Sequence, residues 1–124
     1  MFAGNFAPNG WAFTGGQLIP ISQNTVLFQL IGTTYGGDGQ QNYALPDLKS
    51  RIPMHQGTGI GLSPRTIGSQ GGVESVALQP TPIPGSPAAP VAASVGFRSQ
   101  LQTMSPFLAV NFIISLFGIF PSQN

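Results

Sequence analysis

The sequence predicts a mostly β fold with one short helix, an α+β arrangement connected by Gly- and Pro-rich loops. Glycine turns such as Asn9-Gly10 and Gly36-Gly37 divide the first part of the chain into pieces too short for a helix of three turns. One segment alone has helical spacing, and the C-terminal run alternates with the period of two that is typical of a strand. The 124 residues suffice for one domain.

The expected helix covers residues 24–31. Ser22 is its expected N-cap, and Gly32 supplies a C-terminal stop. The large apolar residues at helical spacing within it are Val26, Leu27, Leu30 and Ile31.

The middle of the chain lacks helical periodicity. Residues 54–72 are rich in glycine and are expected to form a long ordered loop or a strand with bulges. Residues 73–78 are compatible with a short strand. Residues 79–94 contain five prolines and no charge, which predicts a polyproline-like connector.

The C-terminal run, residues 107–120, is predicted to be a β-strand. Its fourteen residues are too few for a membrane-spanning helix, which needs about 20. The even positions are large and are expected to face a dry core: Leu108, Val110, Phe112, Ile114 and Leu116. The odd positions include Ala109, Asn111 and Ser115, small enough for a second copy of the chain to approach closely. Such a copy could supply hydrogen-bond partners for Asn111.

The composition favours self-association. Only 6% of the residues are charged, against about 25% in ordinary soluble domains, and the net charge is +1. The basic residues are too few and scattered for a nucleic-acid surface: Lys49, Arg51, Arg65 and Arg98. There is no cysteine, so disulfides and thiolate metal sites are excluded. No ordinary secretory signal peptide is visible at the N-terminus.

A set of ordered motifs resembles a known family. The composite FAP-x-GW, GQ-L-x-PIS-x-N, LFxLIGTTYGGDG and ALPDLxxR, within residues 2–62, is similar to the phage tail collar domain of bacterial microcystin-dependent proteins. The closing AVNFIISLFGIFPSQN resembles the C-terminal signature of those proteins. The resemblance implies a trimeric, intertwined, collar-type fibre or adhesin module, related to the receptor-binding end of short tail fibres, that acts in attachment rather than catalysis.

The chain departs from that family pattern in three places. No GEIR-like strand precedes Phe2 in this sequence, so the chain starts internally, is processed, or has lost that strand. If the strand is absent from the mature chain, we expect an edge beside residues 2–6 that is open to strand addition. Thr14 stands where many relatives have cysteine. A connector at residues 79–104 replaces the usual variable insertion, where receptor specificity would reside. We therefore expect a collar-like domain over residues 1–78, completed by the strand in residues 105–124. The short connector favours a structural role over a receptor-binding role.

The motif residues singled out are Trp11, Tyr35, Pro46, Asp47 and Arg51. Around Asp47 the pattern favours a local ion pair and turn cap over a ligand clamp. TTYGGDG favours a turn over a phosphate cradle, because it matches neither common phosphate-binding glycine pattern. The aromatic residues Trp11, Tyr35 and Tyr43 either pin loops to a core or stack on a sugar.

Catalysis is not expected. Three carboxylates, one histidine and no cysteine make no plausible nucleophile and base set. No cofactor and no metal are expected, apart from three copies of His55 meeting on a trimer axis.

Two non-enzymatic roles remain for an extracellular, cell-surface or virion-like location. One is a homo-trimeric attachment module that binds a cell-surface glycan or protein. The other is a self-assembling subunit of an extracellular filament or tube. The expected contact residues between copies are Asn111, Ser115, Phe117 and Ile119.

Overall fold

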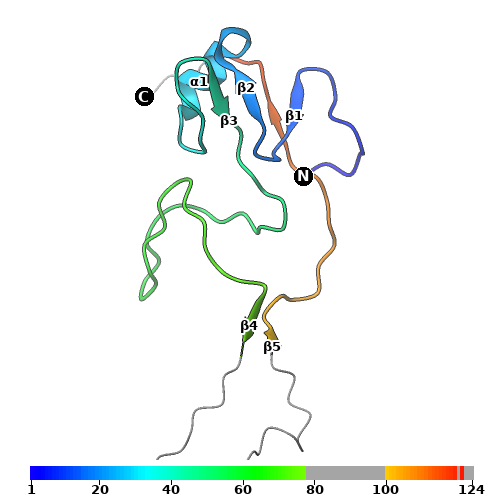
Figure 1. The fold of residues 1–124 in the computed structure, drawn as a ribbon, viewed down its shortest axis with the longest axis vertical. Coiled ribbons are helices and arrows are strands. Elements are labelled where there is room, and N and C mark those ends of the chain that lie inside the picture. Colours follow the sequence, from blue (N-terminus) through cyan, green and yellow to red (C-terminus); the bar gives the residue numbers. More distant parts are fainter. Residues whose placement is uncertain (78–99, 120, 122–124) are drawn as a thin grey trace, which may run out of the picture. The chain divides into compact units, whose positions relative to one another are not determined.

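The computed structural model describes residues 1–77, 100–119 and 121 (Figure 1). Tertiary contacts divide the chain into two units, which are described separately. The first comprises Met1–Ser69 and Ala109–Asn124, and the second comprises Gln70–Leu108. The predicted domain limits at residues 78 and 105 stay a prediction.

The described elements are short, which agrees with the predicted class of a mostly β chain with one α-helix (Figure 1). In the first unit they are β1 (Trp11–Phe13), β2 (Leu18–Pro20), the 3-10 helix η1 (Ile21–Gln23), α1 (Thr25–Ile31), β3 (Asn42–Ala44) and β6 (Ile113–Ser115). In the second unit they are β4 (Ser75–Ala77) and β5 (Gln100–Gln102). No helix in these ranges is long and apolar enough to cross a membrane.

The helix α1 is confirmed, but its predicted N-cap is wrong. Ser22 lies within η1, and Asn24 occupies the N-cap position. The extra 3-10 turn after Pro20 moves the N-cap by two residues, from Ser22 to Asn24, and the helix begins at Thr25. The Asn24 side chain donates to the Pro20 carbonyl at 3.2 Å instead of capping the helix. At the other end, Gly32 has a φ of 55° and its N–H donates to Phe28 at 2.8 Å, so the predicted stop is correct.

The strands β1 and β6 pair across almost the whole length of the chain. They run antiparallel, with Ala12 opposite Ile114. Beyond the ladder, the N–H and hydroxyl of Thr14 both donate to the Phe112 carbonyl, at 3.0 and 3.2 Å, and Leu116 N–H donates to Gly10 at 2.9 Å. The first unit is therefore closed by its C-terminal segment.

The predicted strand over residues 107–120 is too long. Among the described residues only Ile113–Ser115 form a strand, with an isolated bridge between Asn111 and Phe2. The ladder is short because its partner β1 lies between the Pro8–Trp11 turn and the glycine pair that begins at Gly15. The expected dry face is correct at Ile114 and Leu116, which pack against the core. It is wrong at Leu108 and Val110, which are exposed.

The core of the first unit sits between α1 and the β2–β3 pair. These strands are antiparallel, with Ile19 opposite Tyr43. The buried cluster consists of Leu27, Tyr43 and Leu45, and the rings of Phe28 and Tyr43 lie 5.3 Å apart at 53°. Burying each such side chain contributes about 1.5–3 kcal/mol. The partly buried hydrophobic residues around the cluster are Ala12, Ile19, Ile21, Phe28, Ile31, Ile114 and Leu116.

Residues 52–67 of the first unit contain no helix and no strand. Gly57 and Arg65 form an isolated bridge with two reciprocal hydrogen bonds of 2.8 Å. This agrees with the loop alternative of the prediction for residues 54–72. Every residue in this stretch is exposed.

The second unit contains an antiparallel pair, β4 and β5, with Val76 opposite Leu101. Thr103 extends the pairing, because its N–H donates to Glu74 at 3.0 Å and its hydroxyl to Val73 at 2.6 Å. The strand predicted at residues 73–78 is found as β4. The strand β5 was missed, since residues 79–104 were expected to be a connector throughout. The proline-rich part, residues 79–94, lies outside the described residues.

Candidate functional site

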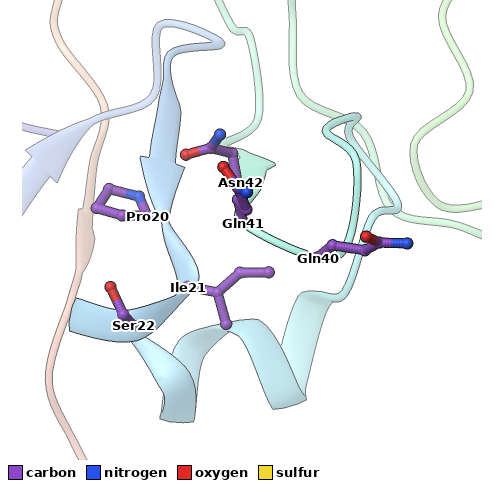
Figure 2. A pocket seen from close by; sticks show the side chains of 6 residues that line it. All are labelled: Pro20, Ile21, Ser22, Gln40, Gln41 and Asn42. Atoms are coloured by element: carbon purple, nitrogen blue, oxygen red, sulfur yellow. The ribbon is translucent and has the colours of Figure 1, made fainter.

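An open pocket of about 470 Å³ lies where β2 runs into η1 and where the next loop enters β3 (Figure 2). One wall is the Pro20-Ile21-Ser22 stretch, and the other is the Gln40-Gln41-Asn42 stretch. Figure 2 shows Ile21 between them, with Gln40 on one side and Asn42 and Pro20 on the other. The pocket is thus built by two chain segments that the β2–β3 pairing brings together.

Asp38 holds one wall of this pocket in place. Its Oδ1 accepts hydrogen bonds from the backbone N–H groups of Gln40, Gln41 and Asn42 at 2.8, 2.8 and 2.9 Å. These bonds, of which that from Asn42 contributes most, lower the pKa of the Asp38 carboxyl below its usual value of 3.8. The loop is therefore organised around its own carboxylate.

The two walls are also joined directly, because Ile21 N–H donates to the Gln41 carbonyl at 2.9 Å. Within the second wall, Gly39 N–H donates to the Asn42 carbonyl at 3.1 Å. The backbone on both sides of the pocket is consequently fixed by hydrogen bonds that do not involve the lining side chains.

The glycine-rich TTYGGDG stretch forms a turn, which is the alternative that its pattern favours. The backbone N–H groups that follow it are occupied by Asp38, an anion of the chain itself. A phosphate at the same position would have to displace this carboxylate and would be repelled by it. The geometry therefore contradicts a phosphate cradle at this turn.

The ALPDLxxR motif forms a second hydrogen-bonded cluster. Asp47 Oδ1 accepts from the Lys49 N–H at 3.2 Å, and Asp47 Oδ2 lies 3.2 Å from Arg51 Nη1. Pro46 and Leu48 join this turn to the Thr14–Gly16 segment, through Gly16 N–H to Pro46 at 3.2 Å and Leu48 N–H to Thr14 at 3.0 Å. Asp47 thus caps a turn and pairs with Arg51, as the pattern favours. Exposed pairs of this kind contribute at most about 1 kcal/mol.

The aromatic candidates have different environments. Tyr43 is completely buried and cannot stack on a sugar, and its hydroxyl donates to the Asn24 carbonyl at 3.4 Å. Burial raises the pKa of this hydroxyl above 10.0. Trp11 is 43% exposed on β1, and Tyr35 is half-buried before the glycine turn. Only Trp11 and Tyr35 keep a surface that a ligand could reach.

His55 lies in the exposed stretch of residues 52–67. Within the described ranges, no group of three or more His, Cys, Asp or Glu side chains could hold a metal ion. The convergence of His55 from three copies stays a prediction.

The four expected contact residues fall into two groups. The Asn111 side chain donates to the Gly4 carbonyl at 2.8 Å, and the Ser115 hydroxyl donates to Phe117 at 2.7 Å. The Asn111 side-chain NH2 group and the Ser115 hydroxyl are thus each bonded within their own chain. Phe117 and Ile119 are exposed, at 68% and 99%.

Sequence reasoning missed the role of Asp38 and the pocket beside it. A usable signal was present, because an Asp after a glycine pair and before a polar run is typical of a turn closed by its own side chain. The pocket itself had no local signal, since its second wall lies some twenty positions earlier in the chain.

Comparison with known families identifies the N-terminal part. Residues 1–53 match the family model of the phage tail collar domain. The collar resemblance deduced from the motifs is confirmed for this stretch, which contains β1, β2, α1, β3 and the ALPDLxxR turn. The narrower resemblance to microcystin-dependent proteins stays a prediction. No curated protein matches the chain.

Proposed function

We propose that this protein is a non-enzymatic, homo-oligomeric fibre module of the tail-collar type, exposed on a virion-like particle or outside the cell. The collar match over residues 1–53 supports a structural tail-fibre-type role. One observation supports the oligomeric part of the proposal: large apolar residues are exposed more often than they are buried.

The buried hydrophobic residues of the described chain are only Leu27, Tyr43, Ala44 and Leu45. Large apolar residues outnumber them on the surface, and residues 52–67 contribute a dense group: Ile52, Met54, Ile60, Leu62 and Ile67. Ile60 is completely exposed and Ile52 is 88% exposed. An isolated chain would present these side chains to water, which is unfavourable for a soluble monomer.

A second copy of the chain suits this surface better than a charged partner. Residues 52–67 carry a single fixed charge, on Arg65, and the whole chain has a net charge of +1. Copies of such a segment associate with only Arg65 to keep at the solvent-exposed edge of the contact, where its charge is not buried unpaired at a high cost. Phe117 and Ile119 provide a further exposed apolar pair at the C-terminal end.

Two assemblies are consistent with this proposal. A closed, symmetric contact gives a compact trimer that acts in attachment, and a head-to-tail contact that does not close gives a filament or tube. The collar match favours the fibre module, whereas the low charge of 6% favours extensive stacking. Electron microscopy of the purified chain distinguishes separate particles from regular filaments.

The decisive experiment is light scattering at micromolar concentration on the intact chain and on a double variant, Ile60→Ser with Leu62→Ser. We expect the intact chain to be oligomeric and the double variant to be smaller at unchanged circular dichroism. The matched control is Gln56→Ser with Thr58→Ser, which changes polar residues of the same loop and should leave the size unchanged. A stable monomer of the intact chain would refute the proposal.

A further inference from the structure

The lining of the pocket beside β3 is polar and uncharged. It offers three carboxamides, from Gln40, Gln41 and Asn42, and the hydroxyl of Ser22. Each carboxamide carries both a donor and an acceptor, so it can bond a hydroxyl group in either direction. Pro20 and Ile21 add apolar surface next to these groups. A matching ligand combines neutral hydroxyl or amide groups with C–H surface.

These polar side chains are uncommitted. Within the described residues, no hydrogen bond uses the side-chain amides of Gln40, Gln41 or Asn42, or the hydroxyl of Ser22. The backbone beneath them is nevertheless fixed, by Asp38 on one wall and by the Ile21–Gln41 bond between the walls. Groups presented by a fixed backbone lose less conformational entropy on binding than groups on a mobile loop.

Two other classes of ligand, anions and metal ions, are disfavoured at this pocket. The Asp38 carboxylate is bonded to the backbone N–H groups of the Gln40–Asn42 wall, and its negative charge disfavours anionic ligands. A metal ion is disfavoured because no cluster of three ligating side chains exists among the residues that the structure describes. The volume of about 470 Å³ falls in the range of small-ligand sites, about 300–1,000 Å³.

We infer that this pocket is a binding site for a neutral saccharide, with Gln40, Gln41 and Asn42 bonding its hydroxyl or N-acetyl groups and Pro20 and Ile21 contacting its C–H face. The inference rests on the attachment role proposed above and gives that role a site and a ligand class. Tyr43, the buried aromatic residue, holds the adjoining strand but does not contact the ligand.

The test is saturation-transfer NMR on the full-length chain with lactose, maltotriose and chitotriose, and with sialyllactose and trigalacturonic acid as acidic counterparts. We expect transfer to at least one neutral sugar and weaker transfer to the acidic ones. Replacing two amides by groups of similar size, Gln40→Leu with Gln41→Leu, should weaken the affinity about tenfold or more. The matched control, Gln23→Leu with Gln29→Leu, alters two exposed glutamines outside the pocket and should bind like the parent.

Several outcomes would overturn the inference: no transfer to any neutral sugar, preferential binding of the acidic sugars, or equal affinity of the pocket variant. A change in oligomer size for that variant would show that the pocket is a contact between copies instead. Light scattering on the same samples separates the two proposals. Sugar binding by a monomer contradicts the oligomeric fibre, whereas an oligomer that binds no sugar contradicts only the site.

Discussion

Residues 18–45 and residues 52–67 both carry large apolar side chains, but only the first segment buries any of them completely. In residues 18–45, α1 and the β2–β3 ladder place Leu27, Tyr43 and Leu45 against one another. In residues 52–67 the backbone makes one isolated bridge, and no second layer lies on the apolar residues. Burial thus follows from regular pairing that positions side chains together, and hydrophobicity alone does not produce it.

The largest expected effect tests this comparison with equivalent truncations in the two segments. Tyr43→Ala should lower the free energy of unfolding by about 3–5 kcal/mol, because it leaves a cavity in the core. Ile60→Ala should change it by less than about 0.5 kcal/mol in a monomeric state, because Ile60 is fully exposed. Urea denaturation at low protein concentration measures both. Equal losses in the free energy of unfolding would mean that residues 52–67 also have a core of their own.

The second contrast compares the cost of adding a side chain at one glycine in each segment, Gly37 and Gly61. Gly37 has a φ of 101°, and a Cβ there would lie 2.7 Å from the Asn42 carbonyl oxygen, so Gly37→Ala combines strain with a backbone clash. We expect it to cost about 2 kcal/mol or more. Gly61 also has a positive φ, of 73°, but has open space around it, so Gly61→Ala should cost about 1 kcal/mol or less. Thermal melts of the two variants provide the comparison, and a larger effect at Gly61 would contradict it.

The smallest expected effect concerns the loop that Asp38 closes. Residues 52–67 have no loop closed by a carboxylate in this way. Because its pKa is lowered in the folded chain, the stability contributed by the Asp38 carboxylate is present above its unfolded pKa and is lost as the pH falls through the folded value. Asp38→Asn should therefore melt below the parent near neutral pH and match it in strong acid.

Melting temperatures of both proteins, measured from neutral to strongly acidic pH, check this prediction. The effect is small because the carboxylate is exposed. A constant difference between the two proteins at every pH would show that shape, and not charge, is what Asp38 supplies.

The sequence by itself determined the features that depend on neighbouring residues. The α-helix, its end at Gly32, the Asp47 turn and the strand at β4 follow from local spacing, backbone preferences and short-range capping. The ordered motifs were also sufficient to predict the collar resemblance that the family model matches over residues 1–53, because a composite at fixed spacing is a property of the linear chain.

Only the tertiary structure decided which distant segments meet. The Thr14–Phe112 bond spans 98 positions, and the length of β6 was set by its short partner β1, not by the alternation of residues 107–120. Tyr43 became a core residue and Gln41 a pocket wall through the same kind of pairing. Local sequence limits the backbone conformations of each segment, whereas burial and pocket shape depend on partners that no local pattern specifies.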